Sequence, residues 1–327
     1  MSDEPFVSVL TPVYNGAEFL AACIESVLRQ THKNFEYIIV NNRSKDRTLE
    51  IATSYAAKDP RISVRTNETF VPVIENHNIA FRLISPDAKY CKIVSADDGV
   101  FPDCFRKLVE LAERHPSVAM VGCYQQSGKD VRWQGFPYPQ EVMKGRDVGR
   151  EILVRNEPTF GFGSPTSLLY RAAIIRENPE FYPDPSPHSD TSACFKHLAH
   201  ADFGFIYQVL CWEQMHEQTQ SFASAGLNRY SSAYLNDVLR FGNAYLNEKE
   251  LEEKVKQILN WYYEFLAVNL FTSRGKDFWQ YHRGRLAELG HPITVLKLLK
   301  AGIAKAGREV VNPGLAISKL QKQFRHS

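Results

Sequence analysis

Two adjacent carboxylates, Asp97 and Asp98, stand where an apolar run of the chain ends, in the stretch KIVSADDGVFPD (residues 92–103). Neighbouring like charges repel each other, so the pair is unfavourable unless something neutralises it. A divalent cation would do so, because Mg²⁺ and Mn²⁺ prefer carboxylate oxygens and often bridge to substrate phosphates. A nearby arginine, or solvation and the capping of a helix near residue 103, would also accommodate the pair, and these alternatives stay open.

The segments around this pair alternate between strand and helix patterns. Short apolar runs predict strands at 6–11, 35–40, 62–66, 89–94 and 118–123. Helical spacing of apolar residues predicts helices at 17–30, 47–58, 73–84 and 104–115. This order is typical of an α/β protein with a Rossmann-like, mostly parallel sheet, in which ligands bind outside the carboxyl ends of the strands. Polar loops at 11–16, 41–46 and 97–98 are therefore expected to face one crevice.

The rest of the chain departs from this alternation. Residues 124–165 are polar, aromatic and rich in turn signals, which is typical of loops that carry binding residues. Residues 230–270 have the apolar spacing of helices. We therefore expect an α/β domain over residues 1–225 and a helical region over residues 226–327. A chain of 327 residues that is 44% hydrophobic is long enough to bury a substantial core.

Composition restricts the partners and the compartment. With 39 Lys and Arg against 37 Asp and Glu, the net charge of +2 gives no reason to expect a nucleic acid partner. The six cysteines show no Cys-x-x-Cys spacing and lie in apolar stretches, so they are expected to be buried thiols in a reducing compartment. The acidic start MSDEP is no secretory signal, and no run of about 18 apolar residues is present. We expect a cytoplasmic protein, either soluble or attached to the inner face of the cell membrane.

The last 37 residues have a charge pattern of their own. Residues 291–327 contain seven Lys and Arg but a single acid, Glu309. The apolar residues of this stretch recur at helical spacing, at Ile293, Leu296, Leu299 and Ile303, and the cations lie largely off that stripe. This pattern is typical of a basic amphipathic helix on an anionic membrane surface. A helix that packs on its own domain with a solvated basic face would give the same pattern, so both interpretations remain.

Four segments together resemble family 2 glycosyltransferases, which are inverting enzymes with the GT-A fold that use nucleotide-diphosphate sugars. They come in the order and approximate spacing of that family: TPVYNG (11–16), VNNRSKDRT (40–48), SADDGVFPD (95–103) and the stretch from PHSDTSACF to QTQS (187–221). Each segment is weakly specific by itself, and the resemblance covers residues 6 to about 222. Beyond residue 226 it implies nothing.

The resemblance implies a nucleotide site at the carboxyl edge of the sheet. Residues expected to line the base, the ribose or the diphosphate are Thr11, Pro12, Tyr14, Asn15, Asn41, Asn78 and Asp97. Two positions depart from the family pattern. NNRS stands where the family usually has DDGS, and Ser95 replaces the first acid of an acidic triplet. An Asn side chain both donates and accepts, so base recognition at Asn41 is retained or altered in preference.

The resemblance also implies the chemistry. Asp97 and Asp98 would hold Mn²⁺ or Mg²⁺ on the diphosphate, with His216 in a segment that can approach the metal, and Asp190 would be the catalytic base. The segment around Asp190 also looks like a helix start with Ser189 or Asp190 as the N-cap, which is compatible with catalysis. A cation stabilises the leaving nucleoside diphosphate, and a carboxylate removes the proton of the attacking hydroxyl, so one displacement inverts the anomeric carbon.

We therefore expect a hexosyltransferase-type enzyme that moves a sugar, most plausibly from a UDP-sugar, to a hydroxyl of a glycan or lipid-linked acceptor in cell-surface polysaccharide biosynthesis. Two alternatives remain. A non-catalytic binding or scaffold protein of the same fold would account for the NNRS and SADD departures. A nucleotidyltransferase would share the sheet and the carboxylates, but it needs a Gly/Lys/Arg-rich phosphate loop that TPVYNGAEF does not provide.

Overall fold

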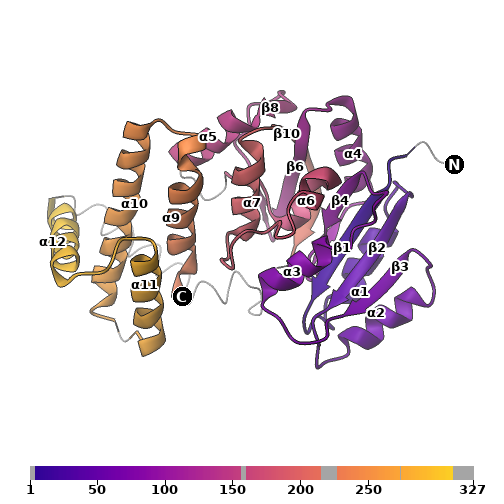
Figure 1. Ribbon diagram of the computed structural model, residues 1–327, viewed down its shortest axis with the longest axis horizontal. Coiled ribbons are helices and arrows are strands. Elements are labelled where there is room, and N and C mark those ends of the chain that lie inside the picture. The colour runs from indigo at the N-terminus through magenta and orange to yellow at the C-terminus, as the bar shows by residue number, and fades with distance from the viewer. Residues whose placement is uncertain (1–3, 156–159, 215–226, 273, 312–327) are drawn as a thin grey trace. The chain divides into compact units, whose positions relative to one another are not determined.

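The computed structural model describes residues 4–155, 160–214, 227–272 and 274–311, without the side chains of 308–311. Two compact units divide the chain, Met1–Ala223 and Ser224–Ser327. The first unit contains the sheet, and the second is built from helices (Figure 1). Each unit is described by itself.

The N-terminal unit is built on a sheet of ten strands in the described residues, and its main path runs β3-β2-β1-β4-β9-β6-β10-β5. The strands of the first half are β1 (Val7–Val13), β2 (Phe35–Asn41), β3 (Ile62–Thr66), β4 (Tyr90–Ile93) and β5 (Asp98–Val100). Those of the second half are β6 (Val118–Ser127), β7 (Asp130–Arg132), β8 (Val142–Lys144), β9 (Leu169–Arg171) and β10 (Asp202–Glu213). Strands β1 to β4 pair in parallel, as the alternating pattern predicts, and β9 enters antiparallel between β4 and β6.

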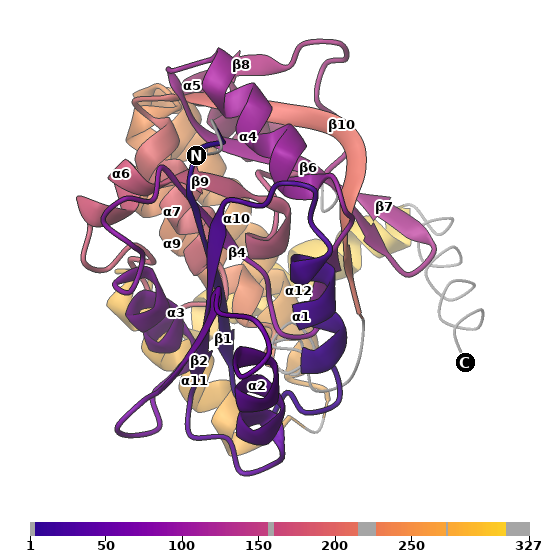
Figure 2. The ribbon, with the colours of Figure 1, turned by 90° about the vertical axis from the view of Figure 1, so that its right-hand side faces the viewer.

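Helices cover both faces of this sheet (Figure 2). One face packs against α1 (Leu20–Leu28), α2 (Thr48–Ala56) and α4 (Cys104–Arg114), whose apolar sides share one core cluster with the strands. The other face carries α3 (Val73–Phe81), α6 (Ala172–Arg176) and α7 (Ser189–Leu198). Because both faces are covered, every residue of β1 is buried, which explains its continuous apolar run. The predicted α/β fold is confirmed.

The segment 124–165 contains more regular structure than its composition indicates. Strand β6 continues to Ser127 and turns back into β7, and α5 (Gly145–Arg155) follows β8. Phe136 packs within 5.5 Å of Phe160, Phe203 and Phe205, measured between ring centroids. Strands β7 and β8 have three residues each, too few to display a periodic pattern, so only their tertiary partners define them.

The C-terminal unit consists of α9 (Arg229–Phe241), α10 (Glu248–Asn269), α11 (Lys276–Glu288) and α12 (Val295–Val311) in its described part. Helix α10 begins with a capping box in which Asn247 and Glu250 each bond the other's backbone N–H. It packs on α9 and α12, and the hydroxyl of Tyr262 bonds His282 Nδ1 of α11 at 2.6 Å. Among the described helices none is both long and apolar enough to cross a membrane.

Candidate active site

The two carboxylates lie at the end of β4, and the second of them opens β5. Asp98 is buried, and its Oδ2 accepts a hydrogen bond of 2.5 Å from the hydroxyl of Thr166. The same hydroxyl accepts a hydrogen bond from the backbone N–H of Ser95 at 3.1 Å. Thr166 therefore fixes both the carboxylate and the turn that leads to it.

Burial raises the pKa of Asp98 well above its ordinary value, and the neighbouring charge of Asp97 raises it further. Hydrogen bonds from Thr166 and Ser95 oppose this effect. No cation of this chain forms an ion pair with Asp98 in the described residues. A buried carboxylate beside a second carboxylate is a suitable environment for a divalent cation, which would stabilise the charged form of both.

The glycine of the DDG motif is explained by a close neighbour. The indole of Trp212, on β10, lies so near Gly99 that an added Cβ would be 2.3 Å from Trp212 Cζ2. Strand β5 pairs antiparallel with β10 through Gly99 and Trp212, so any side chain at this position would displace the ring or the strand. The glycine that follows the two aspartates is therefore required by the close packing of β5 against β10.

A buried lysine holds the turn that contains Thr166. Lys92 is completely buried on β4, and its ammonium donates to the carbonyl oxygens of Thr166 and Leu168, the second at 2.9 Å. These carbonyls belong to the turn around the short 3₁₀ helix η1 (Pro165–Ser167), which begins with a capping box between Ser164 and Ser167. The sequence interpretation treated Lys92 only as part of a strand, although a cation inside an apolar run was a signal for it.

The polar loops after β1 and β2 are joined to each other. Asn15 Oδ1 accepts from the N–H of Lys45 at 2.8 Å, and the N–H of Asn15 donates to Ser44 Oγ at 3.0 Å. Asn41 Oδ1 accepts from the N–H of Ser44 at 3.1 Å. Asn15 and Asn41 therefore lie at the carboxyl edge of the sheet, as expected. Their hydrogen bonds also hold the loops after β1 and β2 together.

Gly16 brings the first loop to the carboxylate segment. A Cβ added there would lie 3.5 Å from the Cβ of Ala96, which directly precedes Asp97. The first of the three loops thus contacts the second and lies close to the segment that carries the carboxylates.

The residues at the end of β1 differ in their access to a ligand. Thr11 is completely buried and donates its hydroxyl to the carbonyl of Val94 at 2.7 Å, and Pro12 is buried within the strand. Tyr14 is 42% exposed and packs on Phe70, which is 59% exposed, with ring centroids 4.8 Å apart. An exposed aromatic pair offers a surface on which a nucleobase can stack. Sequence reasoning did not select Phe70.

Asn78 and Asp190 lie beside one tyrosine on the other face of the sheet. The amide of Asn78 is buried and exchanges hydrogen bonds of 3.0 and 2.9 Å with the backbone of Tyr182. Burial raises the pKa of Tyr182 well above its ordinary value, and the charge of Asp190 contributes. Asp190 also contributes to the raised pKa of Tyr170 on β9, the strand that follows η1. The segment of η1 and β9 therefore supplies a residue near each aspartate, Thr166 next to Asp98 and Tyr170 near Asp190.

Asp190 occupies the first turn of α7, where its Oδ1 accepts from the N–H of Thr191 at 2.8 Å. The N-cap of α7 is His188, so the expectation that Ser189 or Asp190 caps this helix is wrong. The chain enters the helix one residue earlier than the Ser-Asp pair indicates. His216 lies outside the described residues.

Asp97 and Asp98 alone are too few ligands to complete the coordination of a metal ion. Over the described ranges, no group of three or more His, Cys, Asp or Glu could hold a metal ion. Mg²⁺ and Mn²⁺ commonly take one or two carboxylates and complete their coordination with waters and substrate phosphates. Two carboxylates would therefore suit a cation that is shared with a phosphate ligand. All six cysteines are buried, as expected, and no disulfide joins any of them in the described residues.

Comparison with known proteins identifies the family. The model of glycosyl transferase family 2 matches residues 8–177, which is more than half of the chain. The chain therefore belongs to this family.

Its relatives include two uncharacterised glycosyltransferases. EpsJ of Bacillus subtilis is 37% identical over 125 residues, 38% of this chain and 35% of that protein. A Haemophilus influenzae protein is 26% identical over 197 residues, 58% of this chain and 59% of its own length. The chain thus matches only about a third to three fifths of the length of these relatives.

Solved structures share the fold. Residues 1–349 of S. aureus TarS, in complex with UDP-GlcNAc, give a TM-score of 0.62 at 16% identity, covering 87% of this chain and 80% of that one. The mannosyltransferase PcManGT from Pyrobaculum calidifontis, in complex with GDP-Man and Mn²⁺, gives 0.55 at 15% identity, covering 92% and 87%. The predicted GT-A type of fold is confirmed by these matches.

Proposed function

We propose that this protein is an inverting glycosyltransferase that moves one sugar from a nucleotide-diphosphate sugar, first of all a UDP-sugar, to a hydroxyl of a glycan or lipid-linked acceptor. The observation that carries the proposal is the buried Asp98, held by Thr166 next to Asp97 at the carboxyl edge of the sheet. A fixed pair of carboxylate oxygens, on which the described residues place no cation at Asp98, suits a metal–diphosphate ligand. Membership of the family supports the reaction class.

The fold-sharing structures support the class of donor. One of them was solved with UDP-GlcNAc and another with GDP-Man and Mn²⁺. At the corresponding edge of this chain, the exposed rings of Tyr14 and Phe70 would receive the base, and Asn41 would hydrogen-bond its edge. Asp97 and Asp98 would hold Mn²⁺ or Mg²⁺.

A divalent cation in this position would neutralise the charge that develops on the departing diphosphate. Asp190 would take the proton of the acceptor hydroxyl as that oxygen attacks the anomeric carbon from the face opposite the diphosphate. The attack forms the new glycosidic bond while the bond to the phosphate oxygen breaks, so the configuration inverts and a nucleoside diphosphate leaves. The first turn of α7 favours the ionised form of Asp190, because helix N-termini stabilise negative charge.

The proposal extends to a setting at the inner face of the cell membrane, in cell-surface polysaccharide biosynthesis. Seven cations and one acid in residues 291–327 support attraction to an anionic surface. A lipid-linked acceptor would then be reached from the cytoplasmic side.

Calorimetric titration with UDP, dTDP, GDP and CMP, each with and without Mn²⁺, tests the donor site. We expect UDP to bind and the binding to require the metal. Selective binding of another nucleotide would retain the mechanism and change the donor class, with Asn41 as the first residue to examine. If no nucleotide binds, the proposed enzyme function is wrong and the non-catalytic alternative is favoured. If pyrophosphate is released instead of a nucleoside diphosphate, a nucleotidyltransferase is favoured.

A further inference from the structure

Helix α12 turns an apolar face outward. Val295 and Ile303 are 75% and 72% exposed, and Leu296 and Leu299 are also mostly exposed. Positions 295, 299 and 303 follow each other at four-residue intervals, so they form one stripe of the helix, with Leu296 beside it. Leu298 lies next to Val295 on the helix surface, because residues three apart are neighbours, and it is buried. This face is larger and more continuous than the scattered apolar residues that soluble surfaces normally carry.

The end of α10 adds to this surface. Leu270 is half exposed, and Phe271, the next residue, is 91% exposed. Leu270 and Leu298 line the same pocket, so the end of α10 and helix α12 lie on one side of the C-terminal unit. We define the docking face as the exposed residues Val295, Leu296, Leu299, Ile303, Leu270 and Phe271.

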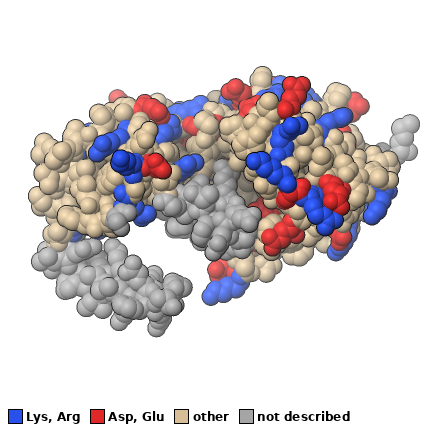
Figure 3. All heavy atoms as spheres, turned by 90° about the horizontal axis from the view of Figure 1, so that it is seen from below, with Lys and Arg blue, Asp and Glu red and all other residues tan. Residues whose placement is uncertain are grey.

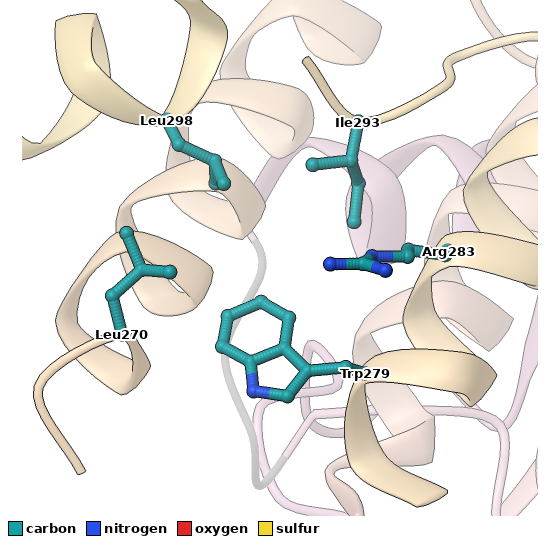
Figure 4. A pocket seen from close by; sticks show the side chains of 5 residues that line it. All are labelled: Leu270, Trp279, Arg283, Ile293 and Leu298. Atoms are coloured by element: carbon teal, nitrogen blue, oxygen red, sulfur yellow. The ribbon is translucent and has the colours of Figure 1, made fainter. Parts of the chain in front are cut away.

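The pocket beside the docking face combines apolar walls with a cation. Its volume is about 200 Å³, and it is lined by Leu270, Trp279, Arg283, Ile293 and Leu298. Figure 4 shows the guanidinium of Arg283 pointing into this space, with the indole of Trp279 below it. Arg283 forms no ion pair in the described part of the chain. An exposed guanidinium without an acidic partner, next to apolar walls, suits an anionic group that is attached to an apolar chain.

The charged side chains described between residues 291 and 307 are of one sign. The described residues 291–307 contain Lys297, Lys300 and Lys305 but no Asp or Glu. In Figure 3, the left-hand part of the molecule, where Figure 1 draws α10 to α12, has more blue than red spheres, and its outer edge is tan. Apolar residues beside cations are the combination that binds anionic lipid headgroups and the acyl region beneath them.

We propose that the docking face lies on an anionic lipid bilayer, with its apolar side chains in the acyl boundary and Arg283 and Lys300 on headgroup phosphates. This deepens the proposed peripheral setting and rests on it. A second copy of the chain is a poorer occupant, because a symmetric contact would bring the same lysines together. Residues 312–327 are poorer too, since they add three cations and no acid.

Co-sedimentation of the full chain with vesicles tests the proposal. One set contains phosphatidylglycerol and phosphatidylcholine in equal parts, and the other phosphatidylcholine alone. We expect binding to the anionic set, weakened by salt because the headgroup contribution is screened. The double variant L299D/I303D should lose about tenfold or more of this affinity. Arg283→Ala should lose roughly fivefold, the effect of one cation near an anionic surface.

Matched controls come from the N-terminal unit. Val154 and Arg146 are exposed residues of α5, so Val154→Asp and Arg146→Ala change the same chemistry away from the docking face. These controls should bind vesicles as the wild type does. Circular dichroism on heating shows whether each variant is folded, and since all five positions are exposed we expect unchanged unfolding curves.

Several results would overturn the proposal. The first is equal binding of the wild type to both vesicle sets, and the second is a loss of vesicle affinity in Val154→Asp as large as that in L299D/I303D. The third is a wild-type protein that does not bind vesicles and forms a dimer that L299D/I303D dissociates. The last result would assign the face to a second copy. Calorimetry with UDP and Mn²⁺ on the same variants separates this proposal from the donor site: vesicle binding can fail while UDP binds, and UDP binding can fail while vesicles bind.

Discussion

The two units of this protein depart from the usual distribution of polar and apolar residues in opposite directions. The N-terminal unit buries polar groups near its sheet edge, among them Asp98, Lys92 and Thr166. The C-terminal unit exposes apolar groups, and among the described residues eight of the sixteen large exposed hydrophobic side chains lie in it although it is the smaller unit. Buried polar groups are costly unless they are paired, and exposed apolar patches are costly in water. Both departures are therefore consistent with the two proposals, a polar ligand at the sheet edge and a lipid surface at the helices.

The largest expected effect tests the chemistry of the polar region. Asp190→Asn should lower the turnover of a UDP-sugar by roughly 10²–10⁴-fold, because the amide cannot take the acceptor proton. UDP binding with Mn²⁺ should stay as in the wild type. Asp147→Asn is the matched control, since Asp147 is also an acid in the first turn of a helix. Turnover that survives in Asp190→Asn would show that another group is the base.

The next effect concerns the support of the carboxylates. Thr166→Val removes the hydroxyl that bonds Asp98 and Ser95, and it should weaken metal-dependent UDP binding by roughly 10–100-fold. Thr166→Ser keeps the hydroxyl and should restore most of the affinity. Calorimetry at several Mn²⁺ concentrations measures this loss. Unchanged metal dependence in Thr166→Val would separate Thr166 from the metal site.

One substitution made in both units sharpens the comparison. Lys92→Met leaves two buried carbonyls without their donor and should lower the free energy of unfolding by about 1–3 kcal/mol. Lys297→Met on α12 removes hydrogen bonds that lie near solvent and should change it by less than about 0.5 kcal/mol. Urea denaturation of the two variants gives the difference. Equal effects would mean that Lys92 contributes no more than a surface cation.

The smallest effect is a dependence of stability on pH. Because the pKa of Asp98 is raised in the folded state, the folded protein holds its proton more tightly than the unfolded chain does. Its contribution is present in full below the ordinary aspartate pKa and is lost as the pH rises through the raised value. Metal-free Asp98→Asn should therefore melt roughly 2–4 °C higher than the wild type at neutral pH.

With Mn²⁺ and UDP present, the wild type should melt above Asp98→Asn, because only the wild type gains stability from the ligand. Thermal melts measure this order, and calorimetry shows which of the two proteins binds the ligand. If metal-free Asp98→Asn melts below the wild type at neutral pH, the carboxylate is stabilised within the protein itself, and a cation is not needed to explain it.

Much of this protein could be predicted from its sequence alone. Strands at the predicted positions and their helices follow from local periodicity, which depends only on neighbours along the chain. The three loops at one edge follow from the rule that parallel strands end together. Buried cysteines were also predicted from composition and spacing. The apolar stripe was predicted at Ile293, Leu296, Leu299 and Ile303, but Ile293 precedes α12, and the sequence left open whether the stripe faces outward.

The tertiary structure decided what depends on contacts between distant segments. Thr166 meets Asp98 across 68 residues, and Lys92 meets the carbonyl of Thr166 across 74. Strand β9 has three residues and gains its place only between β4 and β6. Phe70 became a candidate only when its ring was found against Tyr14. A sequence pattern records which side chains are available, whereas hydrogen bonds and burial arise only when the chain brings them together, so the support of the site was decided by the fold.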